Sequence, residues 1–255
     1  MVKRIIYTSL LCIGAAGLFF AYFFFVGRYA GDRRSHMKCS SVDIVITDSL
    51  FSSAVNPKEI YDSVCPLALG RLVDSIDVLE MERGVRSNGE VMSAEAFVTG
   101  YGKVEMRITQ RRPVVRFKNA TESYYCDRSG YLFPVKHHIE MPIVTGDIPL
   151  ELGGEFKGYP DREQREWLKD MASLAEFIES DGFLKENIQQ IDIESSGDIV
   201  LYTYAGNQKI VFGKCEDIAE KFRKLEAFYK NIVPEKGADR YSCINLKYKN
   251  QIICR

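Results

Sequence analysis

The hydrophobic and polar positions of the chain follow different patterns along its length, and the first is a continuous apolar run. Ile5–Val26 contains no charged residue and is rich in phenylalanine toward its end. As a helix it would span roughly 33 Å, which is enough to cross the hydrocarbon core of a membrane. We therefore predict a transmembrane helix over 5–26, after a short tail at 1–4 and before a linker at 27–40. A cleavable signal peptide is less favoured, because its apolar region is usually about 7–15 residues long.

The next segment, from 41 to about 110, switches between strand and helix patterns. Apolar residues alternate with polar ones over 41–46, which predicts a strand. Asn56-Pro57 is typical of a helix start, and this helix is expected to stop at Cys65-Pro66. A second helix is predicted to begin near Ser75, and two strands should then pair as a hairpin around Gly100-Tyr101-Gly102. The expected order is β-α-α-β-β.

Short strands dominate the remainder of the chain. Two amphipathic helices interrupt them, one capped by Asp161 and one running from Cys215 to Ile232 before Pro234. Two final strands are expected over Arg240–Leu246 and Asn250–Cys254. The sequence therefore predicts an α+β protein whose second domain is a mainly antiparallel sheet with two helices.

A seam between two domains, 41–112 and 113–255, is predicted at Gln110, Arg111, Arg112 and Pro113. Proline has no N–H to donate to a strand ladder, and it pushes the residue before it toward an extended conformation. One sheet should therefore end at this point, and a new one should begin near Val114.

Charge is distributed unevenly between the N-terminal segment and the rest of the chain. Residues 1–38 carry six of the 34 Lys and Arg residues but one of the 35 Asp and Glu residues, so the remainder has six more acids than bases. Nucleic-acid binding needs a basic surface. The acidic body therefore argues against a nucleic-acid partner.

No arrangement of residues indicates catalysis or metal binding. His137 and His138 are adjacent and Glu140 is near, but neighbouring side chains point in different directions and no third ligand has a suitable spacing. The sequence patterns of a nucleophile elbow, a zinc protease and a P-loop do not occur. We expect no catalytic residue, no cofactor, no metal and no small-molecule substrate.

The seven cysteines contain no C-x-x-C pair, which argues against a zinc ribbon or a thioredoxin-like site. Free and mostly buried thiols are the favoured interpretation. Disulfides would be chemically allowed outside the cytoplasm. In that case Cys243–Cys254 and Cys39–Cys65 are pairings to consider.

Several stretches of the sequence resemble the FtsQ/DivIB family of bacterial division proteins, in the form found in Bacteroidetes-type bacteria. They are Gln-Arg-Arg-Pro-Val at 110–114, Tyr-Tyr-Cys-Asp-Arg-Ser-Gly-Tyr-Leu-Phe-Pro at 124–134 and Val-Thr-Gly at 144–146. The resemblance implies that 41–112 is a POTRA domain and that 113–255 is the β domain of the family. It also implies a non-catalytic scaffold in the inner membrane, with a cytoplasmic N-terminus and a periplasmic bulk. The flanking charges alone would favour the opposite orientation.

The resemblance further implies where a partner binds. In FtsQ-like proteins the C-terminal region binds the FtsB–FtsL coiled coil, and FtsB adds a strand. Carried over to this chain, the partner-binding residues are Ile244, Leu246, Lys247, Tyr248, Gln251 and Ile253. A last strand is often an edge strand, and an uncovered edge is a template for pairing. The alternative is that Leu246 and Tyr248 complete the hydrophobic core.

Other partners and functions stay open on the sequence alone. The resemblance implies further division proteins as partners of the POTRA domain and the span. A POTRA-bearing translocation or assembly factor is one alternative, and it would be expected to carry several such modules or a membrane barrel. A membrane-anchored cell-wall enzyme is another, and it should lose activity when one buried acid or histidine is replaced.

Overall fold

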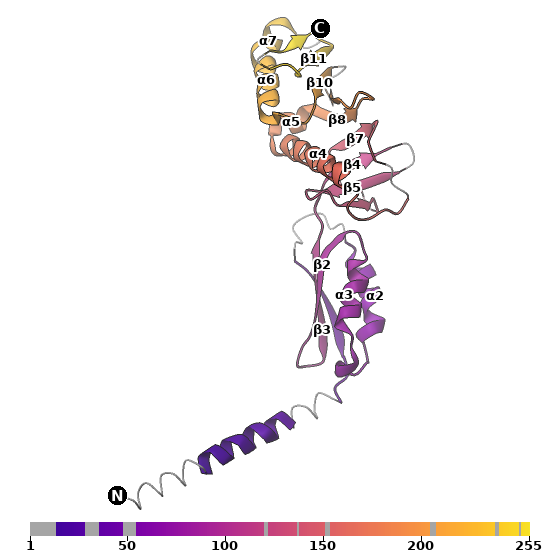
Figure 1. The fold of residues 1–255 in the computed structure, drawn as a ribbon, viewed down its shortest axis with the longest axis vertical. Helices are drawn as coiled ribbons and strands as arrows, with labels where there is room; N and C mark the ends of the chain where they lie inside the picture. The colour runs from indigo at the N-terminus through magenta and orange to yellow at the C-terminus, as the bar shows by residue number, and fades with distance from the viewer. Residues whose placement is uncertain are drawn as a thin grey trace, which may run out of the picture. The chain divides into compact units, whose positions relative to one another are not determined.

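The structure, a computed structural model, divides into two compact units, Met1–Gln110 and Arg111–Arg255 (Figure 1). It describes residues 14–28, 36–47, 55–119, 122–136, 138–150, 154–204, 208–237, 240–249 and 251–255. Each unit has its own sheet and its own helices. The predicted α+β class is therefore confirmed.

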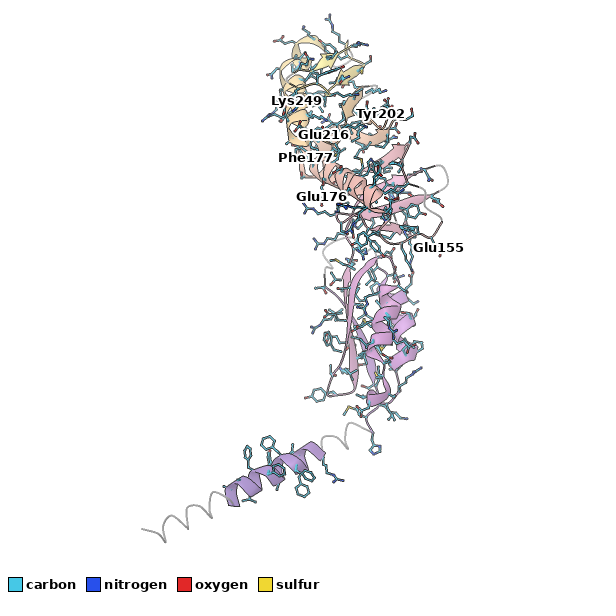
Figure 2. All side chains as sticks on the ribbon, viewed as in Figure 1. Glu155, Glu176, Phe177, Tyr202, Glu216 and Lys249 are labelled. Atoms are coloured by element: carbon cyan, nitrogen blue, oxygen red, sulfur yellow. The ribbon has the colours of Figure 1, made fainter. Side chains whose placement is uncertain are left out.

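Residues 14–28 form a helix whose large apolar side chains are exposed, and Figure 2 shows several of their rings projecting from it. No helix in the described part of the chain has both the length and the apolar character needed to cross a membrane. Residues 5–13 of the span predicted over 5–26 lie outside the part of the chain that the structure describes.

The first unit contains a three-stranded sheet in the order β1-β3-β2, which we call the first sheet. Its elements are β1 (Ser41–Ile46), α2 (Pro57–Ala68), the 3₁₀ turn η1 (Val73–Ser75), α3 (Val78–Arg86), β2 (Val91–Val98) and β3 (Lys103–Gln110). Strands β2 and β3 form the expected hairpin, and β1 lies parallel to β3. Helices α2 and α3 cover one face (Figure 1), where Met81 and Met106 are buried.

Two helix boundaries in this unit differ from the prediction. Helix α2 does not stop at Cys65-Pro66 but continues to Ala68. Pro66 lies in the last turn of the helix, and burial of Val64 and Ala68 keeps this turn packed on the core. Ser75 belongs to the 3₁₀ turn, so α3 begins later, where the side chain of Asp77 accepts a hydrogen bond from the N–H of Glu80.

The second unit contains a nine-stranded sheet in the order β12-β11-β10-β9-β8-β7-β4-β5-β6, which we call the second sheet. Most neighbours are antiparallel, but β4–β7, β7–β8 and β10–β11 are parallel. The strands are β4 (Pro113–Lys118), β5 (Ser123–Asp127), β6 (Leu132–Pro134), β7 (Ile143–Gly146), β8 (Ile188–Ile193), β9 (Ile199–Thr203), β10 (Lys209–Gly213), β11 (Cys243–Asn245) and β12 (Ile253–Cys254). The helices are α4 (Arg162–Ser180), α5 (Gly182–Asn187), α6 (Ile218–Asn231) and α7 (Val233–Lys236).

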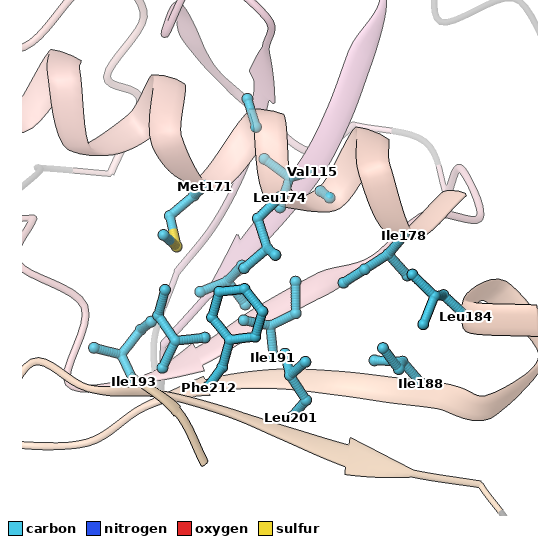
Figure 3. Close-up of a cluster of buried hydrophobic side chains, with 14 of the residues drawn as sticks. Val115, Met171, Leu174, Ile178, Leu184, Ile188, Ile191, Ile193, Leu201 and Phe212 are labelled. Carbon is cyan, nitrogen blue, oxygen red and sulfur yellow. The ribbon is translucent and has the colours of Figure 1, made fainter. Parts of the chain in front are cut away.

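The apolar stripe of α4 packs into the core of this unit. Leu174 and Ile178 face the sheet residues Ile191, Leu201 and Phe212 (Figure 3). Burial of one such side chain contributes roughly 1.5–3 kcal/mol. The apolar face that the sequence pattern predicted for this helix is therefore the face that packs against the second sheet.

The last helix and the last two strands are shorter in the structure than the sequence predicted. Helix α6 begins at Ile218 rather than Cys215, because Asp217 adopts a left-handed conformation with φ 52°. Strands β11 and β12 cover three and two residues. Strand β11 ends at Asn245, whose side chain accepts a hydrogen bond from the N–H of Lys247 at 3.0 Å and so turns the chain.

Candidate partner-binding edge

Strand β12 occupies one edge of the second sheet, which agrees with the expectation for the last strand. Strand β11 holds it in place, because Cys243 and Arg255 exchange two main-chain hydrogen bonds of 3.0 and 2.9 Å. On its other side β11 pairs with β10, and the N–H of Leu246 donates to the carbonyl of Val211 at 2.9 Å. The C-terminal strands are thus built onto the sheet through β10.

The hydrogen-bond register leaves part of β12 facing outward. In an antiparallel pair, residues alternate between those that bond to the partner strand and those whose backbone groups point away. Cys243 and Arg255 are a bonded pair, and Cys254 lies opposite Ile244. The N–H and C=O of Cys254 therefore point to the outer side of β12, which we call the open edge.

The structure divides the predicted partner-binding residues into two groups. The side chains of Ile244 and Leu246 are fully buried in the core of the second unit. By contrast, Tyr248 is 48% exposed and Ile253 is 37% exposed. The remaining two residues of the predicted set, Lys247 and Gln251, are exposed as well. The core interpretation therefore holds for Leu246, whereas Tyr248 does not belong to the core.

Contacts within the chain fix the segment between the two strands. The Nζ of Lys247 lies 2.6 Å from the Oδ2 of Asp198, and this hydrogen bond raises the pKa of Lys247. The stem of Lys247 crosses Gly213, where an added Cβ would meet its Cγ at 2.7 Å. Gly213 has a φ of +81°, so both its backbone and this close approach favour glycine. Lys247 therefore anchors the segment to the sheet.

Helix α6 supplies a further tie that sequence reasoning missed. The Nζ of Lys224 donates to the main-chain carbonyl of Tyr248 at 2.8 Å. Lys249, labelled in Figure 2, lies 4.0 Å from Asp217 at the start of the same helix. No local pattern marks these residues, because the contacts join positions far apart in the sequence.

The predicted seam residues are fixed within their own units. Gln110 is buried at the end of β3, and Pro113 is the first residue of β4. Arg111 forms a 2.9 Å ion pair with Asp127, and its guanidinium lies 3.4 Å from the ring centre of Tyr131. The side chains of this pair are 13% and 12% exposed, so Arg111 is part of the second unit.

Neither the histidines nor the thiols assemble a reactive site in the described residues. His138 is exposed, while His137 lies outside the described residues, and no metal-binding group of three or more ligands occurs in the described ranges. The cysteines from Cys39 to Cys254 are free thiols, so the structure contains neither pairing considered above. Burial raises the pKa of Cys215 to about 12, which keeps this thiol protonated.

The second unit is also the part of the chain that matches a known family. A sequence model of the family described as FtsQ/DivIB, C-terminal related, matches residues 112–255. A comparison with curated proteins finds no match. The matched range covers both the second sheet and its open edge.

Proposed function

The chain belongs to the FtsQ/DivIB C-terminal related family, and on this premise we propose that it is a non-catalytic scaffold of the division machinery. Membership of this family supports a role in bacterial cell division. Its proposed task is to bind an FtsB/FtsL-like coiled coil and to link early division proteins to septal peptidoglycan synthesis. The observation that carries the proposal is the open edge at β12, together with the exposed side chains of Ile253 in this strand and of Tyr248 in the segment before it.

Strand addition at the open edge needs more than main-chain pairing. One hydrogen bond contributes only about 0.5–1.5 kcal/mol net in water, and β12 is two residues long. The apolar areas of Tyr248 and Ile253 would supply the additional contact. A partner that presents an extended strand together with apolar side chains therefore fits this surface best.

We further propose that the protein is bitopic, with residues 5–26 in the inner membrane and the bulk in the periplasm. The uncharged run and the exposed aromatic side chains of the helix over 14–28 support a lipid environment. The β-α-α-β-β order of the first unit supports a POTRA domain. The family resemblance supports the orientation.

Cross-linking in the native membrane, followed by identification of the proteins that co-purify, tests the scaffold proposal. The informative variant combines Tyr248→Glu with Ile253→Glu, because both residues are exposed and their replacement leaves the core intact. Tyr204→Glu is the matched control, since Tyr204 is exposed and follows β9, an inner strand of the same sheet. We expect the wild type and the control to retain a division-protein coiled coil that the double variant loses.

Two results would contradict different parts of this proposal. If the double variant is folded and still retains the coiled coil, partner binding takes place elsewhere on the protein. If no division protein co-purifies with the wild type, the scaffold function itself is wrong.

A further inference from the structure

Backbone contacts bring three separate segments of the first unit together where β1 and β3 begin. The N–H of Cys39 donates to the carbonyl of Arg71 at 2.8 Å, and the N–H of Gly70 donates back to the carbonyl of Cys39 at 2.9 Å. On the other side, the N–H of Ser40 donates to the carbonyl of Gly102 at 2.8 Å. The chain just before β1 therefore lies between the segment that follows α2 and the turn of the β2–β3 hairpin.

These segments expose apolar and basic side chains together. Tyr101, at the hairpin turn, is 87% exposed, and both Leu69 and Leu72 are also exposed. Each of the three segments adds an exposed basic residue to this surface. We call the surface the basic end, and it consists of Lys38, Leu69, Arg71, Leu72, Tyr101 and Lys103.

The position of Tyr101 is fixed by the fold. Gly102, the next residue, is buried with a φ of +71°, and an added Cβ would lie 2.8 Å from the carbonyl oxygen of Lys38. Only glycine allows this close approach. The hairpin turn is consequently held against the backbone that precedes β1, with the tyrosine ring directed to solvent.

The three basic side chains lie on the same segments as the exposed apolar residues, which is the composition of a surface that binds anionic lipid headgroups.

We propose that the basic end rests on a phospholipid surface that contains anionic lipids. This inference rests on the proposed membrane span, which ends two residues before Arg28. From residue 28 to Met37, an extended chain at 3.3–3.6 Å per residue reaches at most roughly 30 Å. The basic end is thus confined near the bilayer, where Tyr101 suits the headgroup region and Lys38, Arg71 and Lys103 suit lipid phosphates.

Photo-cross-linking of the full-length protein in vesicles of phosphatidylcholine and phosphatidylglycerol tests the contact. The photoreactive residue p-benzoylphenylalanine is placed at Tyr101 in one protein and, as the control, at Tyr61 in another. Tyr61 is an exposed tyrosine of α2 in the same unit. Mass spectrometry should find several-fold more phospholipid adduct at position 101. Equal adducts at both positions, or a protein adduct in place of lipid at 101, would overturn the inference.

Charge reversal tests the electrostatic part. Lys38→Glu, Arg71→Glu and Lys103→Glu together should lower the lipid adduct at position 101 several-fold, since the contacts that hold the segments involve the main chain. An unchanged adduct would show that anionic lipid does not recruit this surface.

Flotation of the vesicles separates this inference from the membrane anchor on which it rests. If the wild-type protein does not float with the vesicles, the anchor is wrong and the contact falls with it. If the protein floats and the adducts at positions 61 and 101 are equal, the anchor stands and the contact at the basic end is wrong.

Discussion

The two edges of the second sheet differ in whether another segment covers their outward-facing backbone groups. At one edge, β6 presents the outward-facing groups of Leu132 and Pro134. Leu132 exchanges two hydrogen bonds of 2.9 Å with Gly158, and Pro134 has no N–H to offer. At the other edge, no described residue forms a strand or bridge on the outer side of β12. One edge is closed to strand addition, and the other is open.

This difference separates a closed edge from the edge at which we propose that a partner binds. Uncovered edges favour unwanted pairing, so proteins usually cover them, shorten them or place proline there. The β6 edge combines a bridge with a proline, whereas β12 is limited only by its length of two residues. An open edge retained in this way is consistent with a partner that completes the sheet.

At the β2 edge of the first sheet, a side chain from a helix binds an outward backbone group. The carboxylate of Glu82 on α3 accepts a hydrogen bond from the N–H of Ala96 at 2.9 Å. Ala96 belongs to β2. Thr99 bonds to Lys103 of β3, and bonded residues alternate along an antiparallel pair, so the N–H of Ala96, three residues earlier, points away from β3. A side chain thus satisfies a group that a partner strand would otherwise find free.

The largest expected effect is a difference in stability between replacing a buried and an exposed residue of the predicted partner-binding set. Leu246→Ala should lower the free energy of unfolding by about 2–5 kcal/mol, because it leaves a cavity beneath β11. Tyr248→Ala should change it by less than about 0.5 kcal/mol, as for an exposed position. Denaturant unfolding measures both. Equal losses would mean that the two side chains have the same environment.

A second change tests the open edge through its backbone. Cys254→Pro removes the outward N–H but leaves the hydrogen bonds between Cys243 and Arg255. The affinity for the proposed coiled-coil partner should fall at least about tenfold, which corresponds to 1.4 kcal/mol. Cys254→Ala is the control and should bind as the wild type does. Calorimetry with the purified partner measures this affinity. If the proline variant binds as tightly as the wild type, strand addition at this edge is ruled out.

A third change opens the guarded edge of the first sheet. Glu82→Ala should speed hydrogen exchange at the amide of Ala96 and cost about 1 kcal/mol of stability, the value of one hydrogen bond. Glu95→Ala, at an exposed position of the same strand, should leave both unchanged. Exchange at Ala96 that stays slow in the Glu82 variant would show that the carboxylate does not protect this edge.

The smallest expected effect concerns the ion pair that anchors the segment before β12. The folded protein raises the pKa of Lys247 above its unfolded value of about 10.4, so the pair stabilises the fold below that pH. Lys247→Met should therefore lower Tm at neutral pH, and the difference from wild type should shrink as pH rises above this value. Tm measured across alkaline pH tests the change, and a pH-independent difference would contradict it.

Local signals determined much of the fold before any contact was known. Asn56 and Asp161 were predicted as helix caps, and each accepts a main-chain hydrogen bond from the first turn of its helix. Gly100-Tyr101-Gly102 was predicted as a hairpin turn, and β2 and β3 meet there. Caps and turns involve residues a few positions apart, so the sequence contains the whole interaction.

Boundaries that depend on packing could not be obtained in the same way. Helix α2 continues past Cys65-Pro66 because Ala68 is buried against its neighbours. The extent of β11 is set by its pairing with β10, which covers three residues, and not by the longer run predicted from the sequence. In both cases a long-range contact outweighed a local preference.

The candidate site shows the same division between sequence and tertiary structure. The sequence alone predicted two final strands, over Arg240–Leu246 and Asn250–Cys254, and indicated the last one as an edge strand. Only the tertiary structure showed that Leu246 is buried within the core, whereas Tyr248 lies beyond the end of β11 and is exposed. It also decided which edge stays open, because closing an edge requires a distant segment, such as Gly158 beside β6, to come alongside. Such a contact joins residues whose proximity arises only when the chain folds.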